Sequence, residues 1–157
     1  MCKVMVILGF LAVFVSCNNN VAPTSGNPHQ TNLEKWQSNS TGNYSFYFTN
    51  ICFCFGSYRG PYHIFVKNNS IDSIFNTYNN PTFPNSNPVI PDSQFSHFKT
   101  IDQEFAWVES GLASVHFWDT TYFDPVLGYP RYVYFDYEQM VADEEYGFRI
   151  DSVVIVR

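Results

Sequence analysis

Hydrophobic and polar residues alternate along much of the chain, which is the pattern of strands that bury one face. The alternation is clearest at Tyr44, Phe46 and Phe48, within a strand predicted over residues 44–55. Further strands are predicted over residues 62–67, 70–77, 113–118, 131–137 and 146–156. Turn residues such as Gly128 separate these segments, so we expect antiparallel strands joined by hairpins.

One segment has the period of a helix instead. Thr100 and Gln103 form a predicted capping box at the start of a helix over residues 100–109, and Asp102 complements the positive end of its dipole. We expect Gly111 to end this helix. Its apolar stripe, which should pack on a sheet, consists of Ile101, Phe105, Val108 and Leu112.

A shorter helix is predicted over residues 32–38, with Asn32 as its N-cap and Leu33 and Trp36 on one face. These elements predict an α+β fold, an antiparallel sheet of about six strands with one or two helices packed on one face. Each half of the chain reads as a helix followed by three strands. This similarity indicates either an internal repeat or convergence on the same turn chemistry.

The first residues are typical of an export signal. Lys3 precedes an apolar run over residues 4–15, which is too short to span a membrane but suits a secretory signal. Cys17 follows a small residue, as in a bacterial lipobox, although Phe14 stands where leucine is usual. We expect residues 1–16 to be a lipoprotein signal peptide and Cys17 to carry acyl chains such as palmitate; the alternative is an ordinary signal peptide.

The remaining chain divides into a tether and one domain. Residues 17–31 are polar and rich in asparagine, and they predict a flexible tether before a single domain over residues 32–157. Residues 79–98 contain four prolines, so we expect neither a helix nor a central strand there. Such a long loop is either functional or a tolerated surface insertion.

Composition and charge narrow the classes of partner. Aromatic residues make up 19% of the chain and charged residues only 14%, which indicates a core rich in rings. The net charge is −6, and removal of Lys3 with the signal makes it more negative. Nucleic acids and anionic lipid surfaces both require clusters of lysine and arginine, so we expect neither as a partner.

Cys52 and Cys54 form a pair in a predicted strand. Residues i and i+2 of a strand face the same side with Cα atoms about 6.5–7 Å apart, at the upper limit for a disulfide. A bond therefore requires a local bend. We expect a structural disulfide, and the alternative is a zinc site with His63 or His116.

Other chemistry has little support in the sequence. Acidic side chains near the last strands could bind calcium, but no calcium-loop motif is present, and we interpret them as solvated edge charges. They are Asp119, Asp124, Asp136, Asp143, Glu144 and Glu145. No motif of a serine hydrolase or zinc protease occurs. We expect no enzyme and no cofactor; the alternative is a periplasmic enzyme or metal-binding protein that uses Cys52, Cys54 and His63.

Aromatic side chains in two turn regions suit a binding surface, because such rings carry much of the energy of interfaces. The candidate residues are Tyr122, Phe123, Tyr129 and Phe83. The alternative is that these rings fill an aromatic core. We expect a non-enzymatic binding module whose partner is another envelope protein.

Five features in order resemble an uncharacterised bacterial lipoprotein family that is catalogued only as a domain of unknown function. They are the lipobox, residues 44–48 leading into Cys52-Phe53-Cys54, a strand after Gly60-Pro61, residues 100–105, and Gly128-Tyr129-Pro130 to Asp136 with Asp143-Glu144-Glu145. The resemblance covers residues 44–150. It implies an envelope location, with the outer membrane expected more than the inner one, and a strand with paired cysteines. It implies no reaction.

Overall fold

A computed structural model describes residues 26–54, 56–78, 89–141 and 143–157. Its strands are β1 (Tyr44–Ile51), β2 (Tyr62–Lys67), β3 (Ser70–Asn76), β4 (Trp118–Phe123), β5 (Pro130–Asp136) and β6 (Tyr146–Ile155). Its helices are α1 (Pro28–Asn39), the short α2 (Gly56–Arg59), the 3-10 helix η1 (Asp92–His97) and α3 (Ile101–Leu112). The predicted α+β class is confirmed.

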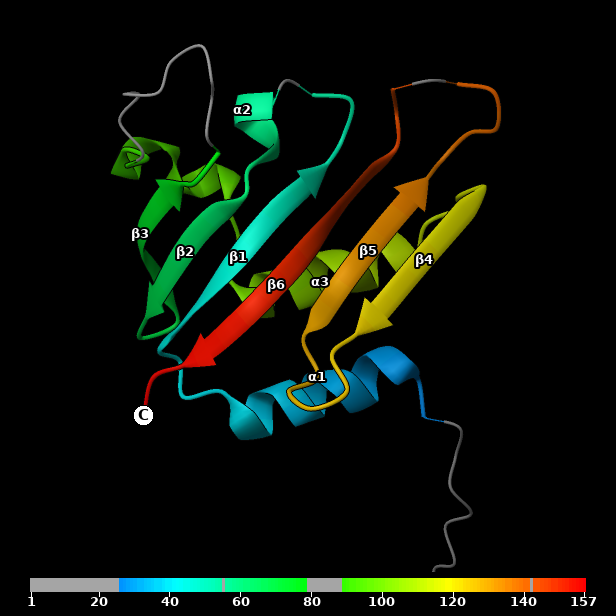
Figure 1. The fold of residues 1–157 in the computed structure, drawn as a ribbon. Helices are drawn as coiled ribbons and strands as arrows, with labels where there is room; N and C mark the ends of the chain where they lie inside the picture. Colours follow the sequence, from blue (N-terminus) through cyan, green and yellow to red (C-terminus); the bar gives the residue numbers. More distant parts are fainter. Residues whose placement is uncertain (1–25, 55, 79–88, 142) are drawn as a thin grey trace, which may run out of the picture.

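All six strands form one antiparallel sheet in the order β3-β2-β1-β6-β5-β4 (Figure 1). The two meanders meet at its centre, where β1 pairs with β6 from Tyr44 opposite Ile155 to Ile51 opposite Gly147. In each half a helix precedes three strands in chain order. The halves are nevertheless not placed equivalently, because β1 is central in the sheet whereas β4 is at its edge.

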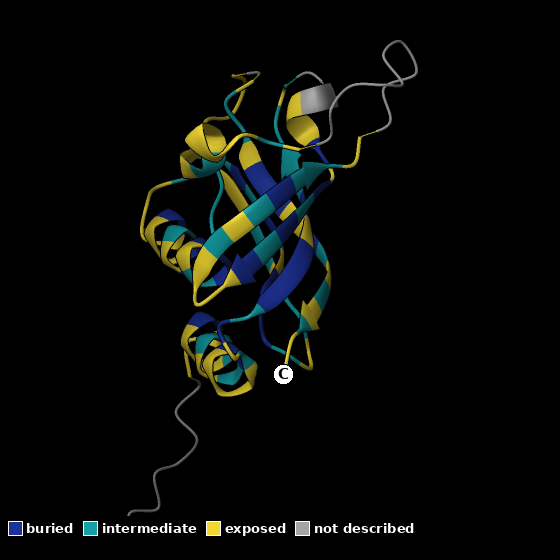
Figure 2. Cartoon of the chain, turned by 90° about the vertical axis from the view of Figure 1, so that its left-hand side faces the viewer, coloured by how far each residue is buried: buried dark blue, intermediate teal, exposed yellow. Residues whose placement is uncertain are grey.

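Helix α3 covers one face of the sheet and forms the core with it. Ile101, Phe105 and Val108 of α3 are buried, and so are the inward side chains of the four central strands, as the dark segments of Figure 2 illustrate. The capping box of Thr100 and Gln103 is present. No helix of the described residues lies on the opposite face of the sheet (Figure 1), so α3 supplies one layer and the sheet the other.

Helix α1 crosses one end of these two layers (Figure 1). Its Trp36 is completely buried, with the ring edge-on to Tyr44 at a centroid distance of 5.0 Å. Trp36 Nε1 donates a hydrogen bond of 3.2 Å to Asp102 at the start of α3. Gly128 has φ +86° in the turn beside α1, and a Cβ there would lie 2.5 Å from the Asn32 carbonyl oxygen, so only glycine fits.

The predicted start of the first helix is wrong. α1 begins at Pro28, with the side chain of Asn27 accepting from the backbone N–H of His29 as N-cap, so residues 28–31 of the predicted tether are helical. The ring of His29 is buried, and its Nε2 lies 2.9 Å from the carbonyl oxygen of Phe105 in α3. This contact ties the first turn of α1 to the core. Residues 1–25, with the predicted signal and Cys17, lie outside the described residues.

The strand predicted over residues 113–118 is also wrong. α3 continues through Gly111 to Leu112, and the edge strand β4 begins only at Trp118. Gly111 is inside the helix because α3 approaches β5 closely there: a Cβ on Gly111 would lie 2.4 Å from the ring of Phe135. Val115, in the connection between α3 and β4, is 95% exposed.

Two other predicted boundaries shift. β1 ends at Ile51, so the Cys52–Cys54 segment lies beyond the strand, and the turn that follows contains α2. Of the predicted proline-rich loop, residues 79–88 lie outside the described residues, and η1 forms part of the remainder. Leu112 of the predicted apolar stripe is 39% exposed, whereas Glu104 is buried on the same helix.

Candidate functional site

Cys52 and Cys54 are joined in a disulfide. Cys52 and Cys54 have Cα atoms 5.2 Å apart, which is possible because the chain leaves the extended geometry of β1 after Ile51. Phe53 between them is 78% exposed. By the chain-entropy estimate, closing a loop of about three residues stabilises the fold by only about 1–2 kcal/mol. The bond therefore fixes this loop more than it stabilises the domain.

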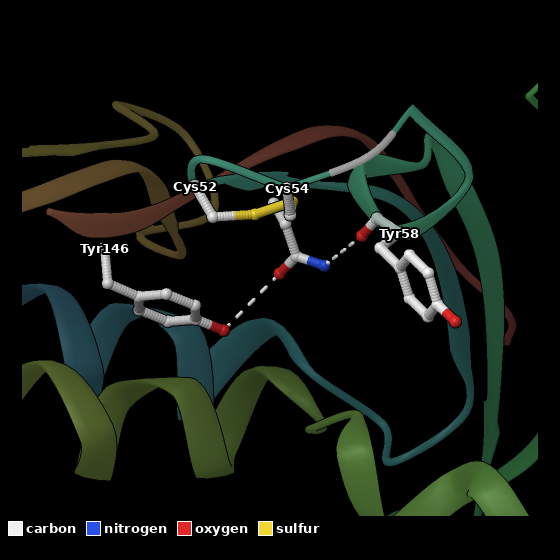
Figure 3. The surroundings of a disulfide bond; sticks show 5 residues. Cys52, Cys54, Tyr58 and Tyr146 are labelled. Atoms are coloured by element: carbon white, nitrogen blue, oxygen red, sulfur yellow. Dashed lines mark hydrogen bonds between the residues drawn. A yellow bond between two sulfur atoms is a disulfide. The ribbon is translucent and has the colours of Figure 1, made fainter. Parts of the chain in front are cut away.

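Asn50 connects the disulfide end of β1 to two neighbouring elements. Its Nδ2 donates a hydrogen bond of 2.8 Å to the carbonyl oxygen of Tyr58 in α2, and its Oδ1 accepts one of 3.4 Å from the hydroxyl of Tyr146 in β6 (Figure 3). Figure 3 also shows the ring of Tyr146 below the disulfide. α2, β1 and β6 are held together beside the disulfide.

A cavity of about 600 Å³ lies beside this disulfide, on the side of the sheet that faces α3. Aromatic rings form much of its wall, and Phe98 packs edge-on to Tyr62 at 4.8 Å. The remaining described lining comprises the disulfide, three side-chain amides, one aliphatic and one imidazole group, from Cys52, Cys54, Asn50, Asn76, Gln94, Ile90 and His97. Burial raises the pKa of the Tyr62 and Tyr146 hydroxyls. The cavity is thus partly desolvated, with several amides on its wall.

Glu104 is a buried acid near this cavity. It is 2% exposed on the core side of α3. Burial raises its pKa to about 7, and Lys99 opposes part of that shift. The charge of Glu104 also contributes to the raised pKa of Tyr146, which lines the cavity. A buried carboxyl is destabilising when ionised, and groups with strongly shifted pKa values cluster at functional sites.

The open face of the sheet is the second candidate site. Its side chains follow from the strand register: His63, Tyr47 and Asp151 are cross-strand partners, so they share the face opposite α3. Two groups of rings lie on it, Tyr47, His63, Phe65 and Phe75 on β1 to β3, and Trp118, Tyr122, Tyr132 and Tyr134 on β4 and β5. Tyr47 and His63 stack at 4.3 Å, and burial lowers the pKa of His63.

A hollow of about 420 Å³ lies on this open face. Tyr122 and Tyr132 form part of its wall, with ring centroids 6.0 Å apart. Arg149 and Asp151 on β6 also line it and are ion-paired, with Arg149 Nε 2.7 Å from Asp151 Oδ2. Arg131 completes the lining and makes no ion pair among the described residues. The hollow therefore combines two rings with an unpaired guanidinium.

The predicted binding residues are not brought together. Tyr122 is 63% exposed on the open face, but Phe123 next to it points inward, with its ring 6.0 Å from Phe105. Tyr129 is 5% exposed and packs against Trp36, so its ring belongs to the core and offers no surface. Phe83 lies outside the described residues. The core alternative therefore applies to Phe123 and Tyr129.

The predicted metal and catalytic groups are also apart. His63 lies on the open face, whereas the cavity beside Cys52 and Cys54 is on the other side of the sheet. His116 Nε2 is 3.1 Å from Asp119, and no third ligand completes this pair. Across the described ranges, no group of three or more histidine, cysteine or acidic residues is placed to hold a metal ion.

The sequence contains signals for several features that the predictions from it missed. Asn27 followed by Pro28 is a cap and first-turn proline, which marks the true start of α1. Glu104 stands three residues after Ile101 and four before Val108, which places it on the buried stripe. Along β1 and β2, the open-face rings of Tyr47, His63 and Phe65 alternate with core residues. The cavity had no local signal, because its wall comes from six separate segments.

Comparison with known proteins identifies one relationship. A family model described as a family of unknown function, DUF6174, matches residues 29–155. No curated protein and no solved structure matches the chain. In the part of the chain that the structure describes, no helix has both the length and the apolar character needed to cross a membrane.

Proposed function

The chain belongs to the DUF6174 family, and we propose that it is a non-enzymatic binding module of the bacterial cell envelope. Acyl chains on Cys17 hold it to a membrane, the outer one rather than the inner, and the open face of its sheet docks on another envelope protein. The apolar run over residues 4–15 followed by Cys17 supports the anchor. The hollow on the open face carries the binding part of the proposal.

The residue types in and around this hollow are those that dominate protein interfaces. Tyrosine, tryptophan and arginine are enriched among the residues that contribute most binding energy. Here Trp118 and Tyr122 are 60% and 63% exposed on the same face as Tyr132. Because Arg131 lacks an ionic partner among the described residues, charge complementarity calls for an acidic side chain on the partner. The occupant is thus a protein with a carboxylate positioned for Arg131.

Photocrosslinking in living cells tests this docking surface. With a photoreactive amino acid in place of Tyr122, we expect a discrete adduct with one other envelope protein. The same residue in place of the exposed Glu109, on α3 and therefore on the opposite side of the sheet, is the matched control and should give no such adduct. The Arg131→Glu substitution should abolish the adduct at Tyr122, because it places like charges together.

Three outcomes would contradict the proposal. Equal adducts from both positions would mean that contact is not specific to the open face. An adduct consisting only of two copies of this chain would replace the proposed partner with a homodimer. Absence of any adduct at Tyr122 would remove the support for a protein partner on this face.

Intact mass spectrometry of the chain purified from membranes tests the anchor and the disulfide together. We expect a chain that begins at Cys17, carries acyl chains, and is lighter by a pair of hydrogens than the dithiol form. A Cys17→Ser chain should lose the acyl mass and separate from membranes, because the anchor is covalent. An unacylated wild-type chain that still begins after a cleaved signal would favour an ordinary secreted protein, and free thiols would remove the disulfide.

A further inference from the structure

We propose that the cavity beside the Cys52–Cys54 disulfide binds an uncharged small molecule that contains a ring system and hydrogen-bonding groups. This site is separate from the proposed docking surface. Tyr62 lines the cavity, whereas its neighbour His63 lies on the open face, and successive side chains of a strand point to opposite sides. The two sites can therefore be tested independently.

The size and shape of the cavity fit a small ligand. Its volume of about 600 Å³ lies within the range of about 300–1,000 Å³ that is usual for small-molecule sites. It lies between the disulfide segment on one side and η1 with Phe98 on the other. Rings from Tyr58, Tyr62, Phe98 and Tyr146 present flat apolar surface from four segments. Flat rings on several walls favour a ligand that is itself ring-shaped, because offset and edge-to-face packing then become available.

The charge of the wall determines the class of ligand. None of the described residues that line the cavity is aspartate, glutamate, lysine or arginine. A charged ligand would lose part of its hydration without gaining a counter-ion from these residues, which is unfavourable. The hydroxyls of Tyr62 and Tyr146 add no charge to the wall, and burial raises the pKa of both. A wall without charged side chains therefore suits an uncharged ligand.

Side-chain amides supply the polar contacts. Asn50 is fixed by its bonds to Tyr58 and Tyr146 and forms a rigid part of the wall. The side chain of Gln94 in η1 makes no hydrogen bond among the described residues, and it offers both a donor and an acceptor. A ligand with a hydroxyl, amide or ring nitrogen can pair with it. A few polar groups on an apolar wall are the usual means by which such sites orient their ligands.

Fluorescence titration with a matched pair of probes tests the proposal. N-phenyl-1-naphthylamine is uncharged, and 1-anilinonaphthalene-8-sulfonate has the same rings with an added sulfonate. They are added to the chain from Asn18 onward, which retains every described element. We expect saturable binding of the uncharged probe at one site, and at least about tenfold weaker binding of the sulfonate, a difference of about 1.4 kcal/mol or more.

Three variants locate the bound probe. Gln94→Trp places a large ring at the cavity and should weaken binding at least about tenfold. Gln37→Trp makes the same change at an exposed position of α1 and should leave binding unchanged. Tyr122→Ala removes a ring from the open face and should also leave it unchanged. Gln94 is exposed, so the fold should tolerate its replacement, which far-ultraviolet circular dichroism would check.

Each of the other results overturns the proposal. Without saturable binding of the uncharged probe, the cavity is not a site for such molecules. If Gln94→Trp binds as the wild type does, the probe lies elsewhere; if Tyr122→Ala removes binding, it lies on the open face. Equal affinity for the two probes would show that the cavity does not select uncharged ligands.

Discussion

Replacing Glu104 by glutamine should stabilise the protein at pH 8 by about 3 kcal/mol, a large effect for one buried carboxyl. Burial raises the pKa of Glu104 from 4.5 to about 7. Between these values the folded state keeps a proton that the unfolded state releases. Stability therefore falls as the pH rises from 4.5 to 7, and the full penalty remains above pH 7.

The measurement is urea unfolding of both proteins between pH 4.5 and 8, followed by tryptophan fluorescence. Glutamine does not titrate, so the stability difference should be small at the acid end and grow toward pH 8. Glu109→Gln, on the exposed side of the same helix, is the matched control and should show a difference that stays flat. A flat difference for Glu104→Gln would mean that this carboxyl is solvated in the folded protein.

Replacing Trp36 by alanine should destabilise the protein by about 3–5 kcal/mol, the usual cost of deleting a buried large aromatic ring. The ring is completely buried and contacts Tyr44 and Tyr129, so its loss leaves a cavity between α1 and the sheet. The hydrogen bond from Trp36 Nε1 to Asp102 is lost as well. Helix α1 packs on the core mainly through the side chains of Trp36 and His29. In the Trp36→Ala variant we therefore expect the backbone amides of α1 to show the largest increase in hydrogen-exchange rate.

Thermal unfolding and hydrogen exchange measure these two effects. Gln37→Ala, at the adjacent exposed position of the same helix, is the control and should change stability by no more than about 0.5 kcal/mol. A Trp36→Ala variant as stable as this control would mean that α1 is not docked on the core. Loss of stability without faster exchange in α1 would instead place the role of Trp36 within the sheet.

Because burial raises the pKa of Glu104, its ionised carboxyl destabilises the folded domain. Glu104 influences the pKa of Tyr146, a wall residue of the cavity. The increase in the free energy of unfolding of Glu104→Gln would measure how much the ionised carboxyl destabilises the domain. Combined with the probe titration, the same variant would also show whether the acid affects binding in the cavity.

Most strands were predictable because each contains the information for its own conformation. Residues 62–67 alternate and are bounded by Gly60-Pro61 and Asn68-Asn69, and β2 has the predicted bounds. The start of α3 was equally local, since Thr100 and Gln103 are three residues apart and form one capping box. The error at residues 113–118 had a non-local cause: Gly111 was read as a helix end, whereas it is retained for close contact with Phe135.

The candidate site was less predictable for a related reason. Tyr122 and Phe123 are similar in type and adjacent, and only their position relative to α3 decides which faces the core. Tyr129 looked like a turn residue available to a partner, but Trp36 from a distant helix covers it. The disulfide of Cys52 with Cys54 was expected from the sequence beside a zinc alternative, and the bend that brings the two cysteines together after Ile51 had no sequence signal that we identified. The walls of the cavity were not, because they come from segments far apart in sequence.

The sequence by itself determined the class of fold, the positions of most strands and the start of α3. These features depend on contacts within a few residues, so composition and spacing are sufficient to indicate them. Only the tertiary structure decided which face of the sheet remains open, that Glu104 is buried, and that a cavity lies beside the disulfide. Those features depend on which distant surfaces cover each side chain, and no local pattern specifies that.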